Sequence, residues 1–103
     1  MKESSVFIYD SMGKAVGMVR EGVIHALNGL AIGQLREDHA YRFTGEYVGQ
    51  LYDGMIVRSA GRQPSNIARV AVSPRSIPPM TAPPVRMAPR HGREDVFRKL
   101  VGR

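Results

Sequence analysis

The chain has 103 residues, no cysteine and a formal net charge of +6 with histidine counted as neutral. This length suits one small domain with a modest hydrophobic core. The lack of cysteine excludes disulfides and a thiol nucleophile, and no apolar stretch approaches the roughly 20 residues of a membrane-spanning helix. The first apolar run, residues 6–8, is too short for the core of a signal peptide, so we expect a soluble cytoplasmic protein.

Charge and proline are unevenly distributed along the chain. Residues 1–63 carry seven Lys or Arg and seven Asp or Glu, whereas residues 64–103 carry eight Lys or Arg, two acids and all seven prolines. Such a change in composition indicates two regions with different physical behaviour. We predict a four-hairpin β domain over residues 1–72 and a basic, proline-rich tail over residues 73–103.

The N-terminal region contains a repeat of 16 residues. Four glycines share this spacing, and a second small residue follows each of them four positions later: Gly13 and Gly17, Gly29 and Gly33, Gly45 and Gly49, Gly61 and Ser65. A fixed spacing of this kind indicates that one structural unit recurs along the chain. It describes how the chain is built and does not by itself indicate an activity.

Each copy of the repeat has the pattern of a β-hairpin. β-forming residues precede the first glycine, as in residues 23–26, and a second short apolar run follows it, as in residues 31–32. Asn28-Gly29 is a strong hairpin signal, because both residues tolerate the positive φ of a type I′ turn. The glycine within the second run predicts a bulge, a sharp bend or a close approach of backbone near a crowded axis.

Four hairpins in tandem must protect the edges of their sheet. An open solenoid needs polar end-caps, and nothing of that kind precedes residue 6. Closing the sheet removes the exposed edges without a cap. We therefore predict an all-β fold, a closed pseudo-four-fold arrangement of four β-hairpins, in which residues 67–72 form a last strand beside residues 6–8.

The repeated pattern resembles that of a known family. Three copies share an apolar residue before the turn, the turn glycine and a following apolar-glycine pair: Ile8-Tyr9-Asp10 with Gly13, Val16 and Gly17; Leu27-Asn28-Gly29 with Ile32-Gly33; Phe43-Thr44-Gly45 with Val48-Gly49. With the Pro/Arg-rich end, this is similar to the bacterial four-fold β-flower domain over about residues 6–70. The fourth copy departs from the pattern at Pro64 and Ser65. The resemblance implies a fold and no established activity.

The tail combines a proline-rich segment with a short apolar end. Residues 73–90 should be extended, polyproline-like or disordered, because proline removes a donor and restricts its neighbour. Residues 93–102 fit a short amphipathic helix, which is marginal alone and needs a surface of this chain or of a neighbour. Its apolar face and the nearby arginines are the candidate partner-binding residues: Val96, Phe97, Leu100, Val101, Arg86, Arg90 and Arg93.

Equivalent positions of a rotational repeat are where a symmetric site would form. Tyr9, His25 and Tyr41 share one such position, and Val57 occupies it in the fourth copy. These side chains form either a polar and aromatic ring that binds a small ligand or ordinary packing contacts. Val57 favours packing, because an aliphatic side chain contributes nothing to a polar ring.

A second equivalent set is acidic. Glu21, Glu37 and Asp53 carry oxygens that a hard divalent cation accepts as ligands, but Arg69 stands in the fourth copy. All three acids lie in segments with turn chemistry. We therefore interpret them as solvated turn residues and predict no metal site.

Few residues suit catalysis. His25, His39 and His91 show no metal-ligand spacing, and no serine has a nucleophile-elbow pattern. We predict no catalytic residue and no cofactor, and a non-enzymatic scaffold or a module for protein–protein interaction or self-association. The alternative is weak nucleic-acid binding through the basic tail, which attracts phosphate but lacks aromatic residues for base stacking; a small enzyme is a third reading.

Overall fold

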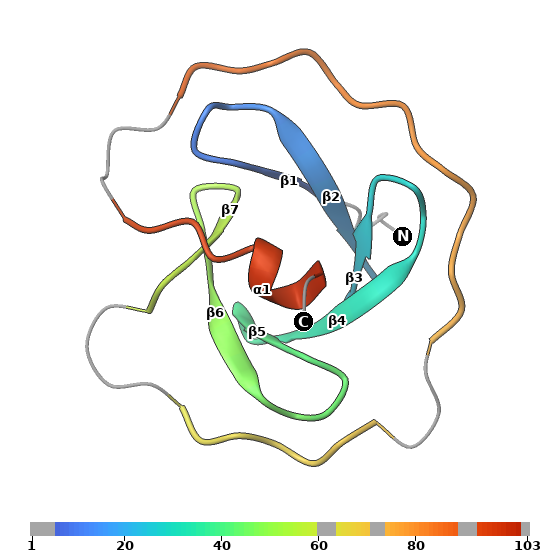
Figure 1. The fold of residues 1–103 in the computed structure, drawn as a ribbon, viewed down its shortest axis with the longest axis vertical. Helices are drawn as coiled ribbons and strands as arrows, with labels where there is room; N and C mark the ends of the chain where they lie inside the picture. The colour runs from blue at the N-terminus through green and yellow to red at the C-terminus, as the bar shows by residue number, and fades with distance from the viewer. Residues whose placement is uncertain (1–5, 60–63, 71–73, 89–92, 102–103) are drawn as a thin grey trace.

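The computed structural model describes residues 6–59, 64–70, 74–88 and 93–101. Its strands form one seven-stranded antiparallel sheet in which each strand pairs with the next along the chain, and this sheet curls into a nearly closed barrel (Figure 1). The predicted closed all-β fold is confirmed. The elements are β1 (Val6–Tyr9), β2 (Ala15–Arg20), β3 (Val23–Ala26), β4 (Ala31–Arg36), β5 (His39–Tyr41), β6 (Tyr47–Tyr52), β7 (Met55–Val57) and α1 (Arg98–Val101).

The 16-residue repeat corresponds to two successive strands, which we call a petal: β1–β2, β3–β4 and β5–β6 are petals 1, 2 and 3. In each petal an aliphatic residue faces the second glycine, and the register shifts immediately afterwards; the pairs are Ile8 with Gly17, Ile24 with Gly33 and Ala40 with Gly49. A bulge therefore lies in the second strand of all three petals, as predicted.

The turn within each petal differs from the predicted type. In petal 2 the Gly29 N–H donates to the Ala26 carbonyl over 2.9 Å, and the Ala26 N–H donates to the Leu30 carbonyl over 3.0 Å. Gly29 has φ 91°, whereas Asn28 is not among the residues with positive φ. This is a three-residue loop in which a left-handed glycine follows a type I turn. The type I′ prediction at Asn28-Gly29 is wrong, because the loop is one residue longer than that turn allows.

Two-residue turns with positive φ at both positions occur instead between the petals. Glu21 and Gly22 have φ 53° and 78°, and they connect Arg20 to Val23, which face each other. Glu37-Asp38 and Asp53-Gly54 repeat this arrangement. The acids of the second equivalent set, Glu21, Glu37 and Asp53, are therefore the first residues of type I′-like turns.

A fourth petal is formed by β7 and a distant part of the chain, residues 94–97. Val57 pairs with Asp95 in an antiparallel bridge, the Arg58 N–H donates to the Glu94 carbonyl over 2.8 Å, and the Val96 N–H donates to the Ile56 carbonyl over 2.9 Å. Residues 94–97 thus take the place beside β7 that β2 takes beside β1. The ring then closes where the Tyr9 N–H donates to the Gly54 carbonyl over 2.7 Å.

The predicted last strand at residues 67–72 is wrong. Residues 64–70 contain no strand, and residues 71–72 lie outside the described residues. The backbone donors of Ile67 and Val70 are used elsewhere, because they bind the carbonyls of Gly45 and Phe43 in petal 3. They are therefore not available to pair with β1.

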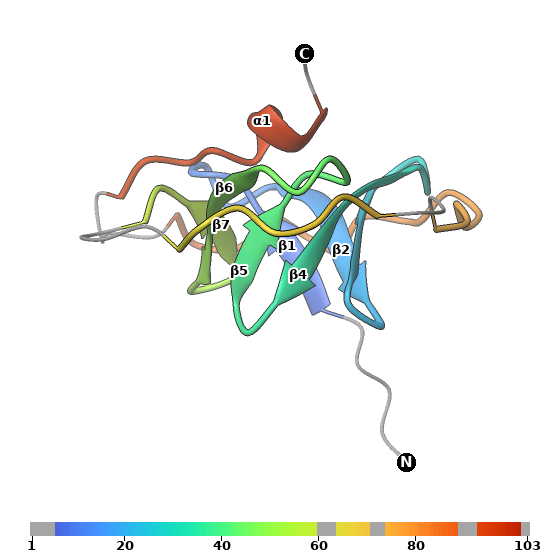
Figure 2. The ribbon, with the colours of Figure 1, turned by 90° about the horizontal axis from the view of Figure 1, so that it is seen from below.

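The C-terminal segment fills the barrel. The predicted helix over residues 93–102 is limited to α1, Arg98–Val101, because the residues before it pair with β7. Val96, Phe97 and Leu100, which we call the plug, belong to the same core cluster as the aliphatic residues of the petals. Figures 1 and 2 show α1 over one end of the barrel, near its axis.

The second glycine of each petal makes room for the plug. A β-carbon on Gly17 would lie 2.8 Å from Phe97 Cζ, one on Gly33 would lie 2.8 Å from Leu100 Cδ2, and one on Gly49 would lie 2.7 Å from Val96 Cγ2. Each plug residue therefore packs on one bare stretch of backbone. The close approach predicted at these glycines is confirmed.

The proline-rich region runs around the outside of the barrel (Figures 1 and 2). Residues 64–70 and 74–88, which we call the belt, form no helix or strand, yet their backbone is bonded to the petals. Its donors bind turn carbonyls over 2.8–2.9 Å: Ile67 to Gly45, Val70 to Phe43, Ile77 to Gly29, Met80 to Leu27 and Arg86 to Gly13. The extended conformation agrees with the prediction, whereas the docking was not predicted. The predicted boundary after residue 72 lies outside the described residues.

Candidate functional site

The three residues of the predicted ligand ring do not converge. Each follows a core aliphatic residue in its strand, so strand alternation turns it away from the barrel centre and toward the belt. The Arg86 guanidinium lies over the Tyr9 ring, 4.2 Å from its centroid. His25 lines one pocket with Ile77, and Tyr41 lines another with Ile67. The structure thus places Tyr9, His25 and Tyr41 under three different belt residues.

These side chains also have local partners. His25 is buried, with its Nδ1 atom 3.2 Å from the Gly29 carbonyl oxygen. Tyr41 meets the Tyr47 ring edge-on at a centroid distance of 5.5 Å, and the Tyr47 hydroxyl lies 3.3 Å from His39 Nδ1. The arrangement supports the packing interpretation of this set.

Most candidate partner-binding residues are used inside the chain. Val96, Phe97 and Leu100 are 2%, 7% and 7% exposed, so they present no face to another protein. Arg93 lies over the Tyr52 ring at 4.4 Å and donates to Gln50 Oε1 over 3.0 Å. Arg90 and the side chain of Val101 lie outside the described residues.

Arg86 acts as a clamp between the two ends of the sheet. Its backbone N–H binds the Gly13 carbonyl in petal 1, and its Nη2 atom donates to the Asp53 carbonyl next to β7. Its buried Nε atom has no hydrogen-bond partner among the described residues. From the sequence, Arg86 was predicted to be a partner-binding residue. In the belt it occupies the position that Ile67 and Ile77 occupy at the other petals, and this equivalence is the signal for a structural role.

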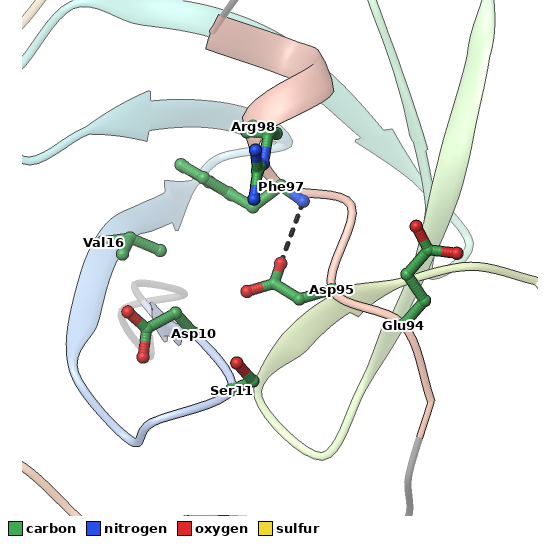
Figure 3. Close-up of a pocket in the computed structure, with 7 residues that line it drawn as sticks. All are labelled: Asp10, Ser11, Val16, Glu94, Asp95, Phe97 and Arg98. Carbon is green, nitrogen blue, oxygen red and sulfur yellow. Dashed lines mark hydrogen bonds between the residues drawn. The ribbon is translucent and has the colours of Figure 1, made fainter.

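A pocket of about 450 Å³ lies between the turn of petal 1 and the C-terminal segment. Figure 3 shows Asp10, from the turn of petal 1, and Asp95, from the C-terminal segment, among the residues that line it. Both carboxylates hold local backbone: Asp10 Oδ1 accepts from the Met12 and Lys14 N–H groups, and Asp95 Oδ1 accepts from the Phe97 N–H. Asp10 and Asp95 are therefore engaged in the turns that form the pocket, and Glu94, which also lines it, pairs with Arg58.

The acids of the second equivalent set do not come together in the described part of the structure. The acids Glu21, Glu37 and Asp53 are exposed in three separate turns, and no group of three His, Cys, Asp or Glu among the described residues could hold a metal ion. No described helix is long and apolar enough to cross a membrane.

The most distinctive surface is apolar. Met12, Leu30, Val85 and Met87 are exposed by 72%, 53%, 66% and 80%. Met12 and Leu30 lie in the turns of petals 1 and 2, and the other two lie in the belt where it crosses petal 1. We call these four residues the rim. Sequence patterns did not single them out, since isolated apolar residues in turns are common.

A ring of β-hairpin petals, filled by its own C-terminal segment and encircled by an extended belt, defines the class of fold. A family model described as "4-fold beta flower protein" matches residues 6–98, and the chain belongs to this family. The match extends beyond the predicted residues 6–70 and includes the belt, Val96 and Phe97. No curated protein and no solved structure matches the chain.

Proposed function

We propose that the protein is a non-enzymatic interaction module that binds another protein through its rim. The observation that carries the proposal is the exposure of Met12, Leu30, Val85 and Met87. Three of them, Met12, Val85 and Met87, flank the bond between Arg86 and Gly13, where the belt crosses petal 1. Large apolar side chains close together on an exposed surface typically mark a protein interaction site. Burying them against a partner removes this apolar area from water.

The rim is attached to a fixed framework. The belt has backbone bonds to the turns of petals 1, 2 and 3, and the plug fills the barrel behind them. A surface held in this way loses little conformational freedom when a partner binds, which favours affinity. The arrangement therefore supports a scaffold-like role for the ring and a binding role for its outer edge.

Several side chains with chemical potential are already occupied by structural contacts. Arg86 contacts Tyr9 and the Asp53 carbonyl, and His25 contacts the Gly29 carbonyl. These contacts favour an interaction module over an enzyme, because a catalytic group must be able to reach a substrate.

The proposal is tested by affinity capture with the full chain, followed by direct binding measurements on each captured protein. A variant carrying Met12→Asn, Leu30→Asn, Val85→Ser and Met87→Ala should lose the partner while it keeps the melting temperature of the unmutated chain. A control with Arg36→Ala and Arg69→Ala, two exposed residues, should keep the partner. A partner that binds the rim variant and the unmutated chain equally would contradict the proposal.

Nucleic-acid binding is a second candidate, supported by four exposed basic residues in the described part of residues 64–103: Arg69, Arg75, Arg98 and Lys99. They are divided between the belt around the barrel and α1 at its end (Figure 2), whereas a nucleic-acid site usually gathers its charge on one face. Binding of this kind should fall steeply as salt rises. Capture that survives moderate salt favours the rim.

A further inference from the structure

The three petals provide an internal comparison for the belt. At each crossing, one belt N–H donates to the carbonyl of the turn glycine: Arg86 to Gly13, Ile77 to Gly29 and Ile67 to Gly45. These bonds align the belt residues on either side of the crossing. The 16-residue repeat aligns the turn residues. Differences between equivalent positions therefore reflect something other than the demands of the fold.

Petal 1 differs from the other two at three surface positions. The position before the turn glycine is Met12 in petal 1, Asn28 in petal 2 and Thr44 in petal 3. The two residues that flank the belt donor are Val85 and Met87 at petal 1, Ser76 and Pro78 at petal 2, and Asn66 and Ala68 at petal 3. Polar or small side chains are thus sufficient in petals 2 and 3. Only petal 1 places three large apolar side chains there, and they are exposed by 72%, 66% and 80%.

The difference removes a stabilising contact. In petal 3 the Asn66 side-chain oxygen accepts a hydrogen bond from the Tyr47 N–H over 3.0 Å, and in petal 2 the Ser76 hydroxyl accepts from the Ala31 N–H over 3.2 Å. Val85 has no oxygen to offer at the equivalent position. Petal 1 therefore lacks this bond and exposes apolar surface, and neither change stabilises the isolated chain.

The charge around these residues indicates the kind of partner. Lys14 is exposed at the end of the turn, where petals 2 and 3 have Leu30 and Glu46. The nearby carboxylates are engaged in contacts within the chain. Asp10 accepts the Met12 and Lys14 N–H groups, Asp95 accepts the Phe97 N–H, and Glu94 pairs with Arg58. The chain as a whole carries a formal charge of +6. Two copies facing each other here would bring like charges together, whereas an acidic partner would be attracted.

We propose that Met12, Val85 and Met87, with Lys14 beside them, form the docking surface for an apolar segment of another protein that carries Asp or Glu next to its apolar residues. Two of the three apolar side chains are methionines, which adapt to differently shaped partners. The proposal deepens the proposed function, because it assigns the partner to one petal of the rim and specifies its charge.

Selection from a random peptide library displayed on phage, with the full chain as bait, tests the proposal. Enriched peptides should combine aliphatic or aromatic residues with Asp or Glu. Synthetic copies should bind about tenfold more weakly or worse to a Met12→Asn, Val85→Ser, Met87→Ala variant, since loss of central apolar contacts commonly has this effect. Lys14→Glu should weaken binding at low salt and have less effect at high salt. The matched control is Thr44→Ala, at the exposed position of petal 3 that is equivalent to Met12, which should bind as the unmutated chain does. Leu30→Asn is made alongside it to test the rest of the rim.

The possible outcomes separate the two proposals. Peptides that lose binding with Leu30→Asn and keep it with the petal 1 variant would overturn the petal 1 assignment and leave the rim as the binding surface. A library without enrichment would count against both proposals. Basic enriched peptides, or a dimer in light scattering that the petal 1 variant dissociates, would overturn the acidic partner.

Discussion

Arg86 lies over the face of Tyr9, with its guanidinium carbon 4.2 Å from the ring centroid. The two residues are far apart in the sequence, and the contact joins the belt to β1 at the place where the barrel closes. The same side chain donates to the Asp53 carbonyl next to β7. One arginine thus connects the belt to both ends of the sheet. Through this contact the belt helps to hold the barrel closed.

Arg86→Ala should lower the free energy of unfolding by about 1–2 kcal/mol, because it removes a partly buried cation–π contact and a hydrogen bond to a backbone carbonyl. Denaturant unfolding measures the effect. Arg75→Ala is the matched control, since Arg75 is an exposed belt residue and should change stability by less than about 0.5 kcal/mol. Equal effects of the two substitutions would mean that the clamp contributes nothing.

Gly33→Ala should destabilise the protein by about 1–3 kcal/mol, as other overpacking substitutions do. The new β-carbon would lie 2.8 Å from Leu100 Cδ2 and 2.9 Å from the Tyr41 carbonyl oxygen. Leu100→Ala alone should cost about 2–5 kcal/mol. In the double variant the loss should be smaller than the sum of the two, because the truncated side chain no longer meets the added methyl group. Simple additivity would show that Gly33 and Leu100 are not in contact.

The sequence predicted the petals well because their determinants are local. Gly29 and its equivalents recur at a fixed spacing, and the second glycine had to serve a bulge or a close approach, both of which the structure shows. The type of turn was misassigned because Asn28-Gly29 suits two kinds of hairpin loop, and the sequence does not specify which residues pair across it.

The docking of the belt was not predicted, and the docking of the plug on its own chain was only one of two alternatives, because the partners of both segments are distant in the sequence. A weaker signal was present: Pro64, Pro74 and Pro83 each stand three residues before a belt residue that bonds to a turn glycine, at Ile67, Ile77 and Arg86. This spacing of nine or ten residues follows the circumference of the barrel and not the 16-residue repeat. Proline composition alone suggested a free tail, whereas tertiary hydrogen bonds hold it.

Gly29→Ala should destabilise the protein by more than Asn28→Ala does. Gly29 has φ 91°, which is costly for a residue with a β-carbon, and the added atom would overlap the Ile77 carbonyl oxygen. The Ile77 amide should also exchange faster with solvent deuterium, because the belt must move away from the turn. If the amide keeps its protection in Gly29→Ala, the belt does not depend on this glycine.

Phe97→Ala should cost about 3–5 kcal/mol of stability, as truncation of a buried aromatic residue generally does. Phe97 is 7% exposed and packs against Gly17. Lys99→Ala, on the exposed side of α1, should leave stability nearly unchanged. Thermal and denaturant unfolding of both variants measure these effects. If Phe97→Ala were as mild as Lys99→Ala, the plug would not contribute to the stability of the barrel.

The central claim of this account is that the proline-rich region is bonded to the barrel and is part of the fold. Residue-resolved hydrogen exchange by NMR on the intact chain tests it most directly. The amides of Ile67, Val70, Ile77, Met80 and Arg86, which donate to turn carbonyls, should be protected, while the neighbouring amides of Ala68, Arg75 and Met87 should exchange quickly. Uniformly fast exchange across residues 64–88 would show that the belt is not docked and would contradict the claim.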